Sequence, residues 1–191
     1  MKNENFRNRY QMLQARLING YVDYYLLEAI DLNKDKLVGN GLLAMQHLVE
    51  VLKRDLCLSL CSICYDTAKS QSNTIASLQQ YIENVYMLSV NIPEFENHHF
   101  IRMKNEVKAA RDTYIAHSDV HSSKDIILLK DLKELLDLAR QAINRLCFVS
   151  FDDEVRETND VMLAQYRMAL SASIISLLQQ GNKGKEDCIN G

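Results

Sequence analysis

Apolar residues recur every three or four positions along most of the chain, which is the spacing of one face of an α-helix. The pattern predicts four long helices, one short helix and a C-terminal helix. The expected ranges are about 6–30, 42–65, 73–85, 94–117, 127–148 and 154–180. In the first helix the buried stripe is expected to comprise Tyr10, Leu13, Leu17, Tyr21, Tyr24 and Leu27. In the fourth long helix, which has the clearest pattern, it is expected to comprise Leu128, Leu132, Leu135, Ala139, Ile143 and Leu146.

The second long helix carries an apolar face wide enough to be buried on more than one side. Its members are Met45, Leu48, Val49, Leu52, Leu56, Leu60 and Ile63. Polar stretches separate the helices. Residues 31–40 are expected to form a connection, with Gly39 and Gly41 flanking Asn40, and residues 66–73 and 120–125 are expected to form a polar loop and a polar turn. Ser72 or Asn73 is expected to cap the short helix, and Pro93 is expected just before the third long helix. Short connections of this kind favour an antiparallel helical bundle.

Length and composition agree with an all-α fold. A chain of 191 residues is most simply a single domain, residues 1–191, and it contains only one proline and six glycines. Residues 181–191 are expected to form a polar tail. The start of the sequence lacks the apolar run of a signal peptide, and no stretch approaches the length of a membrane span. Five cysteines without paired spacing fit a reducing compartment. We therefore expect a cytoplasmic protein without a membrane partner.

One stretch offers catalytic chemistry: His117 follows Arg111 at the sixth position, near the end of the third long helix. A histidine can accept or give a proton near neutral pH, and an arginine presents a fork of donors that suits phosphate oxygens. Together they suffice to cleave RNA without a metal. His117 would move the proton of the ribose 2′-hydroxyl or of the leaving oxygen. Arg111 would stabilise charge that builds on the phosphate.

Helical geometry sets a condition on this site. In an unbroken helix, side chains six residues apart diverge by about 120°. Either the helix loosens near Ala116, or each motif is completed by its counterpart in a dimer. The alternative interpretation is that Arg111 makes a surface ion pair and His117 caps a helix end.

A basic stripe on the same helix supports a polyanion ligand, although the net charge of −3 gives no bulk attraction to nucleic acid. Lys104, Lys108 and Arg111 fall at i, i+4 and i+7, on one helical face. Lys124 lies nearby in the sequence. Lys104, Lys108 and Lys124 are therefore predicted to bind RNA, and the alternative is an ordinary solvated face.

Arg111-Asp112-Thr113-Tyr114-Ile115-Ala116-His117 resembles the signature of HEPN domains (higher eukaryotes and prokaryotes nucleotide-binding). That signature places a polar residue directly after the arginine. Asp112 occupies this slot, where asparagine is the more familiar residue. Residues 116–119, the helical segment 55–66 that ends in aspartate, and the segment 72–82 look like the abortive-infection U-type branch of the superfamily.

The resemblance covers roughly residues 40–150 and implies a helical bundle that is usually dimeric. It implies a metal-independent endoribonuclease, used in phage defence or as a toxin with an antitoxin protein as partner, and no cofactor. Arg111, Asp112 and His117 would be its catalytic residues and RNA its substrate. Some HEPN proteins are instead non-catalytic dimers that bind RNA or another protein, and this is the alternative function.

Other candidate ligands favour structural roles. Cys57, Cys61 and Cys64 share one helical face and are predicted to be core residues. His117 and His121 are spaced i, i+4, but Ser118 stands where zinc proteases have glutamate, so no metal is predicted. His47 is predicted to be a core residue, whereas His98 and His99 are expected to be exposed. The tyrosines Tyr21, Tyr24 and Tyr25 are expected in the core or at a dimer contact.

Overall fold

In the computed structural model, residues 2–36, 40–65, 74–116, 128–148 and 157–189 are described, and every regular element among them is helical. The six α-helices of this described part are α1 (Lys2–Leu32), α2 (Asn40–Cys64), α3 (Ile75–Tyr86), α4 (His98–Ala116), α5 (Leu129–Phe148) and α6 (Asp160–Ile189). Two short 3-10 helices, η1 (Lys34–Lys36) and η2 (Pro93–Glu96), lie between them. The predicted all-α fold is confirmed.

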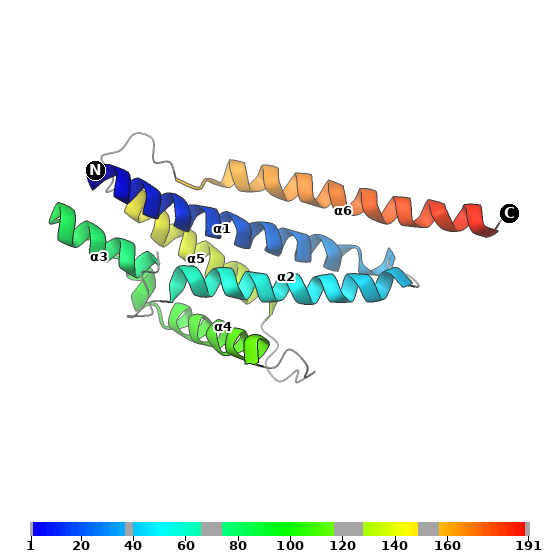
Figure 1. Cartoon of the computed structure of the whole chain (residues 1–191), viewed down its shortest axis with the longest axis horizontal. Helices are drawn as coiled ribbons and strands as arrows, with labels where there is room; N and C mark the ends of the chain where they lie inside the picture. The colour runs from blue at the N-terminus through cyan, green and yellow to red at the C-terminus, as the bar shows by residue number, and fades with distance from the viewer. Residues whose placement is uncertain (1, 37–39, 66–73, 117–127, 149–156, 190–191) are drawn as a thin grey trace.

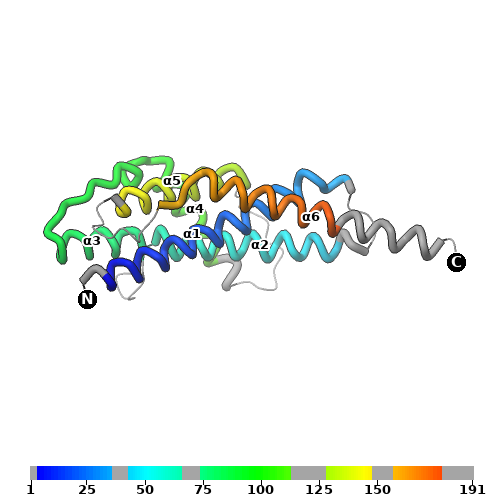
Figure 2. The backbone as a smooth tube through the Cα atoms, turned by 90° about the horizontal axis from the view of Figure 1, so that it is seen from above, coloured from blue at the N-terminus to red at the C-terminus, as the bar shows by residue number. Residues whose placement is uncertain are grey.

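The long helices lie roughly side by side along one axis, with α1 in the middle of the bundle (Figures 1 and 2). α1 packs against α2, α5 and α6, and α4 packs against α2. Figure 1 places α6 and α4 on opposite sides of α1, with α2 and α5 running against the direction of the other three. The short α3 packs at one end of the bundle, against α1 and α5. The antiparallel arrangement leaves α4 on the outside of the bundle, with one face free to carry a site.

The apolar stripes predicted for α1 and α5 form the centre of the core. All six members of the α1 stripe and the five members of the α5 stripe from Leu132 onward are buried. Gly20 explains how closely α1, α2 and α5 can approach. A Cβ atom added at Gly20 would lie 2.9 Å from Leu136 Cδ2 of α5 and 3.5 Å from Leu56 Cδ1 of α2. The missing side chain therefore allows three helices to meet at one point.

Two members of the predicted apolar stripes are exposed, so their predicted place in the core is wrong. Leu128 is 48% exposed because it precedes the first residue of α5, and its carbonyl accepts hydrogen bonds from the N–H groups of Asp131 and Leu132. It therefore caps the helix instead of joining its inner face. Leu48 is exposed in the first half of α2. Figure 1 shows α4 beside the second half of α2 only. The broad apolar face is therefore covered where it contains Leu56 and Leu60 but not at Leu48.

Helix ends also differ from the predictions. The cap of α3 is Thr74, whose side chain accepts from the Ser77 N–H at 3.1 Å, and not Ser72 or Asn73. The third long helix begins at His98 instead of Glu94, since Pro93 opens the separate helix η2. The loops predicted at 66–73 and 120–125 lie outside the described residues.

α6 begins later and extends further than the predicted range 154–180. Residues 157–159 are not helical, and the Asn159 side chain caps α6 by accepting from the Met162 N–H at 2.9 Å. The helix then continues to Ile189, so most of the segment predicted as a polar tail is helical. Among the described helices, none has a stretch long and apolar enough to cross a membrane.

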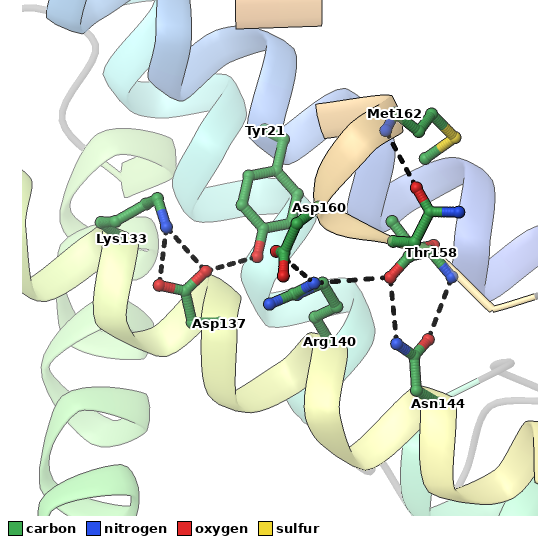
Figure 3. A network of polar contacts seen from close by, with 9 residues as sticks. Tyr21, Lys133, Asp137, Arg140, Asn144, Thr158, Asp160 and Met162 are labelled. Atoms are coloured by element: carbon green, nitrogen blue, oxygen red, sulfur yellow. Dashed lines mark hydrogen bonds and ion pairs between the residues drawn. The ribbon is translucent and has the colours of Figure 1, made fainter. Parts of the chain in front are cut away.

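A polar network fixes the start of α6 to the bundle (Figure 3). Thr158 is fully buried, and Asn144 of α5 exchanges two hydrogen bonds with its backbone, at 3.0 and 3.1 Å. Arg140 of α5 pairs with Asp160 at 2.8 Å. One helical turn away, Asp137 accepts from the hydroxyl of Tyr21 at 2.6 Å and pairs with Lys133. Buried polar groups at this junction are thus largely satisfied within the chain.

Candidate functional site

The candidate site lies on α4, which is held against the second half of α2. The buried side of α4 consists of Phe100, Met103, Val107 and Ala110, spaced three or four residues apart. The thiol of Cys61 donates to the Val107 carbonyl at 3.7 Å, a contact that joins the two helices. At the start of α4, the Asn97 side chain accepts from the His99 N–H at 2.8 Å and caps the helix.

The segment before α4 is fixed by an ion pair. Glu94 of η2 is almost fully buried, and the Arg145 Nε of α5 donates to both of its carboxylate oxygens, at 2.9 and 3.2 Å. A buried carboxylate is costly unless it is paired in this way. The pairing therefore positions η2, and with it the first turn of α4, on α5.

The basic stripe predicted on this helix meets a tyrosine from α2. The Nζ atoms of Lys104 and Lys108 lie 5.2 and 5.0 Å from the centre of the Tyr65 ring. The Tyr65 hydroxyl donates to Asn105 Oδ1 at 2.8 Å. Tyr65 directly follows α2, so the end of that helix brings an aromatic ring to the middle of α4. Both ammonium groups are within the range of a cation–π contact.

The two lysines differ from the arginines of α4 in how their charge is balanced. Arg102 pairs with Glu106 and Arg111 pairs with Asp112. Neither Lys104 nor Lys108 has an ion pair with a residue in the part of the chain that the structure describes. Their positive charge is therefore held in place by an aromatic ring and remains uncompensated there. A phosphate is the kind of group that such a surface attracts.

Arg111 extends the stripe by one turn and is oriented by its neighbour in the sequence. Its Nε and Nη2 atoms donate to Asp112 Oδ1 at 2.9 and 2.6 Å. Adjacent residues in a helix do not normally face each other, so the two side chains turn towards each other to make this contact. The hydrogen bond to Asp112 raises the pKa of Arg111, and the guanidinium keeps its charge. At 25% exposure, the side chain is still accessible to a ligand.

The cysteine face lies beneath this surface. Cys57, Cys61 and Cys64 are buried, as predicted for core residues. Burial raises the pKa of Cys57 to about 12 and the pKa of Cys61 to about 11, so both thiols stay protonated near neutral pH. The described residues contain no group of three or more histidine, cysteine, aspartate or glutamate side chains that could hold a metal ion.

Of the predicted site residues, Lys104, Lys108, Arg111 and Asp112 lie along one helix, and the first three are on the same face. His117, His121 and Lys124 lie outside the described residues. α4 stays helical as far as Ala116, the residue before His117, so the described part of the motif shows no loosening.

The remaining histidines and tyrosines give a mixed outcome. The prediction for His47 is wrong: it is exposed, in the first half of α2 that α4 does not cover. His98 is exposed as expected, while His99 is half-buried and its Nε2 lies 3.0 Å from Glu134 of α5. Tyr21, Tyr24 and Tyr25 of α1 are core residues, which is one of the two roles expected for them.

Tyr65 and Asn105 are the members of this surface that the sequence prediction did not include. No spacing rule connects Tyr65 with lysines about forty positions later. Only the packing of α2 against α4 connects them. When the two helices run antiparallel, the cysteine face of α2 packs against the apolar face of α4, and this packing brings Tyr65 to Lys104.

Comparisons with protein-family models, with curated proteins and with solved structures find no match to the chain. The HEPN resemblance therefore rests on the residues themselves, and any function has to be argued from the surface just described.

Proposed function

We propose that the chain is a metal-independent endoribonuclease of the HEPN type, in which Arg111 contacts the phosphate that is cleaved and His117 is the general acid and base. The observation that carries the proposal is the basic surface on α4. Lys108 and Lys104 present uncompensated charge one and two turns from Arg111, respectively, on the same helical face. This arrangement suits a phosphate backbone that runs along the helix towards the arginine.

The proposed reaction uses the RNA's own nucleophile. A basic His117 takes the proton from the ribose 2′-hydroxyl, and the 2′-oxygen attacks the adjacent phosphorus. The bond to the 5′-oxygen of the next nucleotide breaks, and that oxygen takes a proton from the imidazolium. The products are a 2′,3′-cyclic phosphate and a 5′-hydroxyl end, with no change in oxidation state. Arg111 stabilises the charge on the phosphate oxygens, and Asp112 keeps the arginine fork oriented.

The proposal includes a homodimer, because side chains six residues apart on one helix diverge. A second copy would bring its own Arg111 and His117 to the same cleft. Leu58 of α2 and Ile101 of α4 are exposed apolar side chains on the two helices that carry the site, and they could contribute to such a contact. By the same resemblance, the biological role is phage defence or a toxin paired with an antitoxin protein.

The alternative function is a non-catalytic HEPN dimer that binds RNA or another protein. It is favoured by one observation: Lys104 and Lys108 lie over the ring of Tyr65, and this cationic and aromatic surface suits RNA binding without a proton-transfer group. A binding protein would need Lys104, Lys108 and Tyr65 but no general base.

Incubation of purified protein with transfer RNA or total RNA in EDTA tests the proposal. The variants are His117→Ala and Arg111→Ala. The control is Arg102→Ala, which removes an exposed arginine that pairs with Glu106 on the same helix. We expect cleavage by the wild type and the control, and a loss of about 100-fold or more for both site variants. Thermal melting checks that each variant folds.

Equal cleavage by the wild type and His117→Ala would refute the catalytic role. Cleavage that appears only after a divalent metal is added would refute the mechanism. RNA binding without cleavage by the wild type would support the non-catalytic alternative.

A further inference from the structure

We infer that Tyr65 is a base-stacking residue, and that Tyr65, Lys104 and Lys108 together form a subsite for an unpaired nucleotide next to the phosphate at Arg111. The inference rests on the proposed function in so far as the ligand is RNA. It adds a residue from α2 to a site that was predicted on α4 alone. It also specifies the ligand as single-stranded.

The first argument concerns the groups that lie against the cationic side chains of the protein. Arg167 is paired with Glu28, and Lys133, which also lies over the rings of Tyr21 and Tyr24, is paired with Asp137. At Lys104 and Lys108 an aromatic ring takes the place of the carboxylate. A ring holds an ammonium group without neutralising it, so the charge stays available to a phosphate. Two lysines on one ring therefore indicate an anion site in preference to an internal ion pair.

The second argument is that Tyr65 lies outside the core. Tyr65 is only half-buried, whereas Tyr21, Tyr24 and Tyr25 are in the core. Its hydroxyl donates to Asn105, so the ring is held in one orientation with both ammonium groups over it. An oriented aromatic ring flanked by basic side chains is the combination that binds single-stranded nucleic acid. Bases stack on the ring and phosphates contact the cations.

The third argument concerns whether the bound RNA is a single strand or a duplex. In a duplex the bases are stacked on one another and are not available to a surface tyrosine. Lys104 and Lys108 can contact the backbone of either a duplex or a single strand. Only the single strand can engage the phosphates and the ring at the same time. The subsite therefore favours loops and unpaired regions of RNA.

Binding can be separated from cleavage with a short labelled oligoribonucleotide in which every 2′-hydroxyl is methylated. Such an RNA lacks the nucleophile of the proposed reaction and cannot be cut by it. Fluorescence anisotropy compares this probe as a single strand with the same probe annealed to its complement. Tyr65→Leu removes the ring, and Tyr65→Phe keeps the ring without the hydroxyl. Tyr81→Leu is the matched control, because Tyr81 is a half-buried tyrosine on α3 with Arg9 over its ring at 5.2 Å.

We expect Tyr65→Leu to weaken single-strand binding about tenfold or more. Tyr65→Phe and Tyr81→Leu should bind within about threefold of the wild type, and the duplex should be insensitive to Tyr65→Leu. Lys104→Gln and Lys108→Gln should each lower the slope of log affinity against log salt by about 0.7. Unchanged single-strand binding by a folded Tyr65→Leu variant would overturn the inference. An equal loss for the single strand and the duplex would also overturn it.

A second measurement does not depend on the leucine variant. The chain has no tryptophan, so Tyr65→Trp creates a single tryptophan, which can be excited selectively and can still stack. We expect the methylated single strand to quench this fluorescence and the duplex to leave it unchanged. The absence of quenching while the strand is bound would refute stacking at position 65. The cleavage assay with His117→Ala bears only on catalysis, so either proposal can fail while the other stands.

Discussion

Replacing Asp23 with asparagine is expected to stabilise the protein at neutral pH and to have little effect in acid. Asp23 lies on α1 and is half-buried. The pKa of Asp23 is raised from 3.8 to about 6 in the folded protein. Burial is the larger cause, and the negative charge of Asp55 on α2 is the smaller one. A carboxyl whose pKa is raised by folding is easier to ionise in the unfolded chain. Its contribution to stability is therefore present below about pH 4 and is lost as the pH rises through about 6.

The size of the effect follows from the shift. A rise of about two pKa units corresponds to about 3 kcal/mol of unfolding free energy at neutral pH. Because water still reaches part of the side chain, screening lowers the expected value to about 1–2 kcal/mol. Asparagine has nearly the same shape and no charge, so it should recover that amount without creating a cavity.

Urea unfolding, followed by far-ultraviolet circular dichroism at about pH 4 and about pH 7.5, measures the effect. Asp23→Asn should exceed the wild type at the higher pH and equal it at the lower pH. Asp55→Asn should shift stability in the same direction by less, since Asp55 is the smaller cause. Glu50→Gln, at an exposed position on α2, is the control and should change little. A gain of the same size at both pH values, or no gain at pH 7.5, would refute the reasoning.

Two further predictions concern the core. Asn144→Ala should lower the unfolding free energy by about 2–3 kcal/mol, because it removes two hydrogen bonds to the buried Thr158 backbone. Urea unfolding tests this against Gln141→Ala, an exposed position on α5, and a loss below about 0.5 kcal/mol for Asn144→Ala would contradict it. Cys57 and Cys61 should resist iodoacetamide at about pH 8 in the folded protein, since burial raises both pKa values and excludes the reagent. Peptide mapping before and after unfolding checks this, and alkylation of Cys61 at the same rate in both states would count against it.

The helices could be predicted because the core depends on a local repeat. In α1 and α5, residues three or four positions apart share a face, and that face is buried in the structure. The ends of the helices could not be placed as well. Glu94 was assigned to the third long helix, but its carboxylate is instead buried against Arg145 of α5, far away in the sequence. Thr74 caps α3 in place of two equally suitable neighbours. Such choices depend on tertiary contacts that a spacing rule does not contain.

In the candidate site, too, the features set by local spacing could be predicted and the features set by tertiary contacts could not. Lys104, Lys108 and Arg111 share a face of α4 because of helix geometry alone, so the stripe could be predicted. Tyr65 reaches the stripe only because α2 and α4 run antiparallel in one register, in which Cys61 contacts Val107. A shift of one helical turn would move the ring by about 5 Å and away from one of the lysines. The residue that most distinguishes the surface was therefore the least predictable.

The charges of the site suggest an order of events under the proposed function. Asp112 offsets part of the field of Arg111, whereas no carboxylate of the described residues pairs with Lys104 or Lys108. An approaching phosphate backbone is consequently attracted first to the lysines. Arg111 already donates two hydrogen bonds to Asp112, so it has fewer donors left for a phosphate but a fixed direction in which to present them. The lysines and Tyr65 would thus supply binding, and the oriented arginine would contribute where charge builds on the phosphate.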